Sequence, residues 1–286
     1  MEIDWQSQDG LSLYARLYAG PHAGAPTVLC LHGLTRNSRD FEDLAPHLQR
    51  RYRVIAPDLR GRGFSARDPN IQNYQPSIYV QDILGLLDAL AAPRVAVVGT
   101  SLGGMLAMSL GVGQPGRISG IVLNDVGPEI DPVGVERIKQ YAGRLPPART
   151  WSLAVTQTKN MFGDAWPDLE PDRWQALARR GFREDAAGMV EVDADPGIGE
   201  ALRAAPAATL DLWPLWQGLR DVPTLAIRGA RSDILSAATF ARMKRENPGL
   251  QQLEVANRGH VPLLDEPECI AALDAFLSRI FPAPPA

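Results

Sequence analysis

Short apolar runs alternate with amphipathic segments along the first 125 residues, and this alternation limits the possible folds more than any other feature of the sequence. The apolar runs are continuous, as in residues 27–33 (TVLCLHG) and 95–99 (VAVVG). Continuous runs of this length are typical of strands covered on both faces. The intervening segments, such as residues 79–90 (YVQDILGLLDAL), have helical periodicity. The pattern predicts an α/β fold in which helices cover both faces of a mostly parallel sheet.

The alternation stops between residues 128 and 214 and then returns. The interruption contains helical patterns and no convincing buried strand, whereas residues 222–229 (VPTLAIRG) again have the character of a buried strand. We therefore expect one core built from residues 1–127 and 215–286, with a helical cap inserted at residues 128–214. The opening segment alternates around Asp9 and Gly10, which predicts an antiparallel hairpin.

Composition and charge exclude several classes of function. The chain of 286 residues is 45% hydrophobic and 22% charged, as is typical of globular proteins. Its net charge of -4 and its interspersed basic residues argue against nucleic-acid binding. No signal-peptide pattern and no membrane-length apolar run is visible, so we expect a cytoplasmic protein with no membrane partner. Cys30 and Cys269 are too few for a disulfide framework, and we expect neither a metal nor a cofactor.

Residues 99–103 (GTSLG) match the G-x-S-x-G pattern of a nucleophile elbow. They follow a predicted buried strand and precede a predicted helix, which is the context that the pattern requires. Glycines permit the sharp turn that exposes the serine at the end of the strand. We therefore predict that Ser101 is a nucleophile, against the alternative of a glycine-rich turn with an incidental serine.

With this elbow, the chain resembles the α/β-hydrolase superfamily, in particular serine hydrolases with a helical cap. The similarity runs over nearly the whole length and depends on motifs at residues 31–33 (LHG), 58–65 (DLRGRGFS), 99–104 (GTSLGG), 228–233 (RGARSD) and 258–260 (RGH). The resemblance implies an oxyanion hole formed by the backbone N–H groups of Leu34 and Leu102.

A serine hydroxyl needs a base to remove its proton, and histidine suits that role. The chain has four histidines: His22, His32, His47 and His260. Only His260 follows a late predicted strand, where the family places its base. His32 precedes the predicted oxyanion loop, and we expect it to shape that loop.

Two aspartates are candidates for the carboxylate that orients the histidine. Asp233 follows the predicted strand at 222–229, and Asp125 ends an earlier one, so both are expected at the carboxyl edge of the sheet. Family members more often use the later position, which favours Asp233 and leaves Asp125 as the alternative. The order serine, aspartate, histidine along the chain is kept with either residue.

The remaining motifs favour a small-molecule pocket. Residues 61–66 (GRGFSA) fit a dinucleotide-binding pattern, but Arg67 and Asp68-Pro69 follow where a phosphate-binding helix should begin. Aromatic and sulfur-containing residues gather in the predicted cap and favour a neutral, fairly hydrophobic substrate. The expected pocket residues are His32, Trp151, Met161, Phe162, Trp166 and Val261.

The resemblance implies hydrolysis of a carboxylic ester or lactone through an acyl-enzyme. Serine at the elbow argues against the haloalkane dehalogenases and epoxide hydrolases of the superfamily, which have aspartate there. Carbon–carbon bond hydrolases of meta-cleavage type, amidases and cofactor-free perhydrolases resemble the chain about equally well, because specificity resides in the cap and pocket. A receptor or scaffold that retains the fold is the non-enzymatic alternative.

Overall fold

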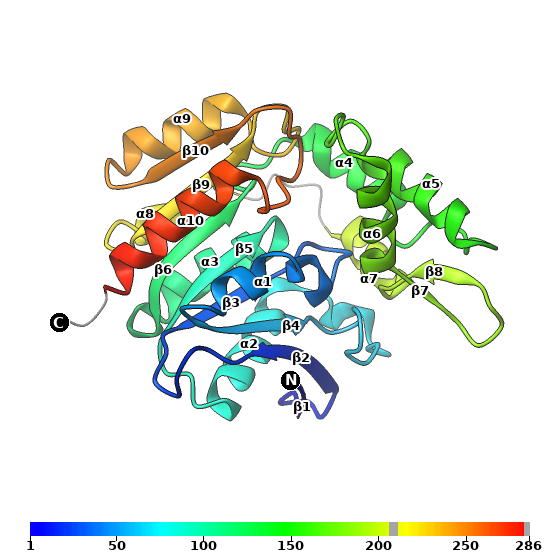
Figure 1. Ribbon diagram of the computed structural model, residues 1–286, viewed down its shortest axis with the longest axis horizontal. Coiled ribbons are helices and arrows are strands. Elements are labelled where there is room, and N and C mark those ends of the chain that lie inside the picture. Colours follow the sequence, from blue (N-terminus) through cyan, green and yellow to red (C-terminus); the bar gives the residue numbers. More distant parts are fainter. Residues whose placement is uncertain (206–210, 283–286) are drawn as a thin grey trace.

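The computed structural model describes residues 1–205 and 211–282, and its centre is an eight-stranded sheet (Figure 1). The strand order is β1-β2-β4-β3-β5-β6-β9-β10. The strands β1 and β2 pair antiparallel, as do β2 and β4, and the other neighbouring pairs are parallel. The strands of this sheet are β1 (Glu2–Gln6), β2 (Ser12–Tyr18), β3 (Thr27–Leu31), β4 (Arg53–Asp58), β5 (Val95–Thr100), β6 (Ile118–Asn124), β9 (Thr224–Gly229) and β10 (Gln251–Val255).

The expected α/β fold with a mostly parallel sheet is therefore confirmed, and so is the opening hairpin. Every residue of β3, β5, β6 and β9 is buried, which explains why these strands appear as continuous apolar runs.

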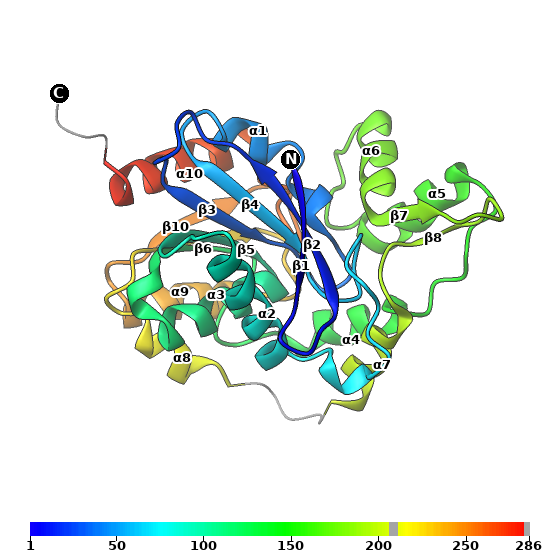
Figure 2. The ribbon, with the colours of Figure 1, turned by 90° about the horizontal axis from the view of Figure 1, so that it is seen from below.

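Helices cover both faces of this sheet (Figure 2). The helices α1 and α10 pack on one face, and α2, α3, α8 and α9 contribute to the hydrophobic cluster on the other. These helices are α1 (Leu44–Leu48), α2 (Pro76–Ala89), α3 (Leu102–Gly113), α8 (Trp213–Gly218), α9 (Ala237–Glu246) and α10 (Pro267–Ile280). Two such layers remove the apolar side chains on each face of the strands from water.

We call residues 128–214 the cap segment. Residues 206–210 of this segment and residues 283–286 of the predicted core lie outside the described part of the chain. The elements of the cap segment gather on one side of the sheet in both views (Figures 1 and 2). They are α4 (Pro132–Tyr141), α5 (Trp151–Phe162), α6 (Pro171–Gly181), β7 (Phe182–Glu184), β8 (Val190–Val192) and α7 (Pro196–Ala204).

The cap segment is not entirely helical. The strands β7 and β8 pair as a short antiparallel hairpin, which the search for buried strands did not predict. Each strand has only one buried residue, so the hairpin lacks the continuous apolar run on which that search depended. Within the described ranges, none of the helices combines the length and apolar character needed to cross a lipid bilayer.

Candidate active site

The turn between β5 and α3 exposes Ser101 at the end of a buried strand. Ser101 has a φ of 52°, in the left-handed region that costs a non-glycine residue about 1–3 kcal/mol. Its neighbours must be small, because a Cβ at Gly99 would lie 2.4 Å from the carbonyl oxygen of Gly103, and one at Gly103 would lie 2.1 Å from that of Leu31. Both glycines of the G-x-S-x-G pattern thus allow backbone segments to approach closely.

Three side chains from distant parts of the chain form one line of hydrogen bonds. The Nε2 atom of His260 lies 2.9 Å from the Oγ atom of Ser101. On the other side of the ring, the Nδ1 atom of His260 lies 2.7 Å from the Oδ2 atom of Asp125. Both His260 and Asp125 are buried. The line Ser101–His260–Asp125 has the geometry in which an imidazole can take the proton of a serine hydroxyl.

Asp125 is held rigidly by its other hydrogen bonds. Its Oδ1 atom accepts from the backbone N–H of Gly229 at 2.8 Å, and its Oδ2 atom also accepts from the hydroxyl of Ser232 at 2.6 Å. The strands β6 and β9 are neighbours, so the residues that follow them meet at one edge of the sheet.

The expectation that Asp233 orients His260 is wrong in this structure. The carboxylate of Asp233 forms a two-pronged ion pair with Arg137 of α4, at 2.6 and 2.9 Å. Although burial raises the pKa of Asp233, the hydrogen bonds and charge of Arg137 bring it below its ordinary value. Asp233, which the resemblance favoured, therefore binds the cap segment through Arg137, and the alternative, Asp125, contacts His260.

The loop after His260 is held from two sides. The side-chain amide of Asn124, at the end of β6, donates to the carbonyl oxygen of Pro262 at 2.9 Å. The indole N–H of Trp166, in the cap segment, donates to the carbonyl oxygen of Val261 at 2.7 Å. These bonds link the position of His260 to both the sheet and the cap segment.

The loop after β3 lies beside Ser101. A Cβ at Gly33 would be 3.9 Å from the Cβ of Ser101. Among residues 1–205 and 211–282, the backbone N–H groups of Leu34 and Leu102 have no hydrogen-bond acceptor. The first follows Gly33 and the second follows Ser101, so both are suited to stabilise charge on an oxygen bound there.

The buried ring of His32 holds the peptide group that carries the Leu34 N–H. Its Nε2 atom accepts from the backbone N–H of Leu59 at 3.0 Å, so the ring proton is on Nδ1 and is donated to the carbonyl oxygen of Gly33 at 2.7 Å. Burial lowers the pKa of His32 to about 3, which keeps the ring neutral. The guanidinium of Arg62 holds the next carbonyl, that of Leu34, at 2.9 Å.

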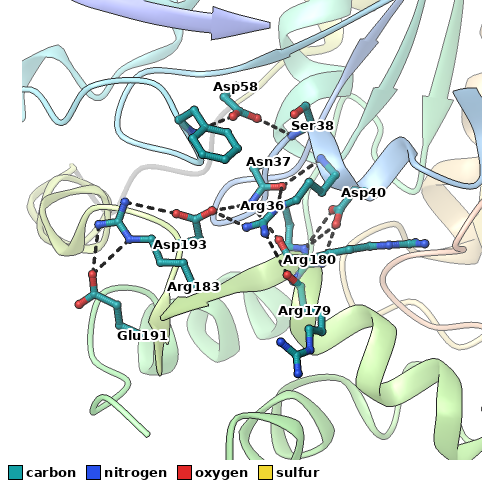
Figure 3. Close-up of polar contacts among 12 residues, drawn as sticks. Arg36, Asn37, Ser38, Asp40, Asp58, Arg179, Arg180, Arg183, Glu191 and Asp193 are labelled. Carbon is teal, nitrogen blue, oxygen red and sulfur yellow. Dashed lines mark hydrogen bonds and ion pairs between the residues drawn. The ribbon is translucent and has the colours of Figure 1, made fainter. Parts of the chain in front are cut away.

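The same loop contacts the residues on either side of the β7–β8 hairpin, at the end of α6 and directly after β8 (Figure 3). The side-chain amide of Asn37 donates to the carbonyl oxygen of Arg180 at 2.9 Å and to the carboxylate of Asp193 at 3.3 Å. Arg39 also pairs with Asp193. Burial raises the pKa of Asp193 despite this ion pair. The loop that carries the Leu34 N–H is therefore connected to the cap segment through buried polar contacts.

A cavity of about 70 Å³ reaches Ser101, and its lining tests the predicted pocket. Phe162, Trp166 and Val261 line this cavity, and Met161 lines a neighbouring one. His32 and Trp151 line neither, so these two predictions are wrong. His32 is fully buried beneath the loop, and the indole N–H of Trp151 donates to Glu184 within the cap segment.

Sequence reasoning assigned no role to three buried polar residues: Asn37, Arg62 and Asp193. Arg62 lies within the stretch at 58–65 that carried part of the resemblance, which is the one signal that pointed to it. Asn37 and Asp193 act through each other across the fold, and a single sequence carries no sign of that contact. In the described ranges, no cluster of three or more His, Cys, Asp or Glu side chains is arranged to hold a metal ion.

The sequence profile described as "Alpha/beta hydrolase family" matches residues 28–273, which span both the elbow and the histidine. The chain belongs to the alpha/beta hydrolase family. Its architecture agrees with that of an alpha/beta hydrolase from Novosphingobium aromaticivorans, with a TM-score of 0.92 and 43% identity over 98% of each chain.

Curated relatives of the chain have names that specify different substrates. A 3-hydroxybutyrate-oligomer hydrolase of Cupriavidus necator is 32% identical over 95% of both chains. A 2-hydroxy-6-oxo-2,4-heptadienoate hydrolase of Pseudomonas putida is 29% identical over 78% of both chains. The chain is thus similar to hydrolases that are named for different substrates.

Proposed function

We propose that the chain is a serine hydrolase that cleaves a carboxylic ester through an acyl-enzyme. The observation that carries the proposal is the line of hydrogen bonds Ser101–His260–Asp125, with distances of 2.9 and 2.7 Å. In this proposal these three residues form a catalytic triad, and the cap segment closes the pocket above them.

In the proposed mechanism the Oγ atom of Ser101 attacks the acyl carbon while the Nε2 atom of His260 takes the hydroxyl proton. The N–H groups of Leu34 and Leu102 stabilise the negative oxygen of the tetrahedral intermediate. When this intermediate collapses, the bond to the alcohol breaks and the alcohol leaves with the proton from His260. The acyl group stays on Ser101 as an ester. Water then attacks this ester, again with His260 as base, and the free acid leaves. Asp125 holds the imidazole in the required tautomer and stabilises its charged form.

The choice of an ester is supported by the relative whose name specifies 3-hydroxybutyrate oligomers, because hydroxy acids oligomerise through ester bonds. This relative is similar to the chain over 95% of both sequences. Lactones, which are cyclic esters, fit the same chemistry. Carbon–carbon bond hydrolysis is the second candidate, and it is favoured by the similarity to the heptadienoate hydrolase. Both reactions use a nucleophile, a base and an oxyanion site, so substrate comparison is needed to separate them.

A fluorophosphonate probe tests whether Ser101 is an activated nucleophile. The wild-type chain is expected to be labelled at Ser101, with labelling abolished in Ser101→Ala. An unlabelled wild-type chain would contradict the proposed triad and favour a binding protein on the same fold.

A substrate panel tests the bond type. It contains p-nitrophenyl esters of increasing chain length, a lactone and a vinylogous 1,5-diketone. We expect turnover of the esters and no comparable turnover of the diketone. Hydrolysis of the diketone alone would overturn the ester assignment and support carbon–carbon bond cleavage.

A further inference from the structure

A second cavity lies beside the one that reaches Ser101, and the proposed mechanism gives it no role. Its volume is about 140 Å³, compared with about 70 Å³ for the cavity at the nucleophile. Four residues line both cavities: Thr35, Arg36, Tyr141 and Phe162. These four residues lie between the two spaces; we call their position the junction and the space beyond it the distal cavity.

The walls of the distal cavity suit an aliphatic chain. Its apolar lining residues include Leu145, Pro147, Met161, Phe182, Val192 and Ala194. Apart from Arg36, the charged side chains that line this cavity have hydrogen-bond partners. Arg67 donates to Glu191 at 3.1 Å, and Asp195 accepts from the hydroxyl of Tyr74 at 2.7 Å.

Arg36 differs from these residues because part of its guanidinium has no partner. Its Nε and Nη2 atoms donate to Asp40 at 2.6 to 3.0 Å. Its Nη1 atom has no acceptor among residues 1–205 and 211–282, and neighbouring atoms do not cover it fully. The Nη1 atom lies beside Gly181, which lines the distal cavity.

The position of this guanidinium depends on a glycine of the cap segment. A Cβ at Gly181 would lie 2.3 Å from the Nη1 atom of Arg36, so any other residue there would have to displace the arginine. The ring of Phe162 lies below the guanidinium, 5.9 Å from its central carbon. The Arg36 side chain thus extends from the loop after β3 to the cap segment and is only 13% exposed.

We infer that the distal cavity is a substrate subsite, in which the Nη1 atom of Arg36 binds a carboxylate at the far end of an aliphatic ester. This inference rests on the proposed function and adds a substrate class to it, namely esters that end in a free acid. The ester carbonyl lies at Ser101, and the chain passes the junction to reach the distal cavity. Because Asp40 already balances the charge of Arg36, recognition depends on charge-assisted N–H bonds and not on a net positive field.

The test compares esters that differ only at the far end. The substrates are the mono-p-nitrophenyl ester of glutaric acid and the same ester with its free acid capped by a methyl group. We expect the wild-type kcat/KM to be roughly tenfold to a hundredfold higher for the free acid, as is typical of hydrogen bonds to a charged group. In Arg36→Gln the ratio of the two kcat/KM values is expected to fall to near one.

Two further variants provide controls. Arg39→Gln removes a neighbouring arginine that lines neither cavity, so it should leave the ratio between the two esters unchanged. Leu145→Trp fills the distal cavity, so it should lower kcat/KM for the free-acid glutarate ester more than for p-nitrophenyl acetate. Thermal unfolding of each variant reports whether it is folded.

The outcomes separate this inference from the proposed function. If the wild-type chain hydrolyses the acid and the capped ester equally well, or if Arg36→Gln keeps the preference, the inference is overturned and the ester hydrolase remains. If no ester is hydrolysed and the fluorophosphonate does not label Ser101, the proposed function fails. In that case calorimetric binding of monomethyl glutarate to the wild-type chain, lost in Arg36→Gln, would still support the subsite, and its absence would overturn it.

Discussion

Replacing Asp125 by asparagine should reverse the tautomer of His260. The Oδ1 position of Asp125 faces the backbone N–H of Gly229 at 2.8 Å, so the amide oxygen of an asparagine has to take this place. The amide nitrogen then occupies the Oδ2 position, 2.7 Å from the Nδ1 atom of His260. Because that nitrogen donates, Nδ1 has to accept, and the ring proton moves to Nε2. An Nε2 atom that carries a proton cannot take the proton of Ser101.

The expected loss in kcat for Asp125→Asn is about four orders of magnitude, since the wrong tautomer abolishes general-base catalysis while the oxyanion donors remain. This corresponds to about 5.4 kcal/mol of transition-state stabilisation. Steady-state hydrolysis of p-nitrophenyl acetate measures it, with circular dichroism to show that the variant is folded.

Asp233→Asn is the matched control, because it makes the same chemical change at the position that the resemblance favoured. Its ion pair with Arg137 is about one-third exposed at each partner, and such pairs contribute about 1 kcal/mol or less. We expect kcat to fall less than about tenfold, which is far smaller than the loss of the tautomer. A large loss in Asp233→Asn together with a small one in Asp125→Asn would refute the reasoning.

Three further predictions concern the groups that support the site. Between pH 6.5 and 3 the unfolded chain protonates His32 while the folded chain keeps it neutral. As the pH is lowered through this range, the free energy of unfolding of the wild type should therefore fall by about 1.4 kcal/mol per pH unit more than that of His32→Gln. Equal slopes in urea unfolding would contradict this. Asn37→Ala should increase hydrogen exchange in the β7–β8 hairpin and lower kcat, because it breaks the bond to Asp193, and unchanged exchange would show that this bond does not hold the hairpin. Trp166→Phe removes the bond to the Val261 carbonyl and should lower kcat by about tenfold, whereas a change confined to KM would mean that the indole only lines the pocket.

By itself the sequence determined the features that depend on local patterns. Continuous apolar runs predicted the buried strands, and the spacing of two glycines around Ser101 predicted the elbow, because both depend on contacts between near neighbours or on backbone sterics. The position of His260 after a late strand was also evident, since it is the one histidine in such a context.

The tertiary structure alone decided which carboxylate contacts the histidine. Asp125 and Asp233 follow neighbouring parallel strands, so the sequence pattern placed both at the same edge, and the resemblance then favoured Asp233, which is wrong. The choice depends on contacts between residues far apart in the chain: Arg137 of the cap segment pairs with Asp233, while Gly229 holds Asp125 against His260. Such contacts leave no periodic trace in one sequence, because hydrogen bonds between distant side chains depend on how the segments pack.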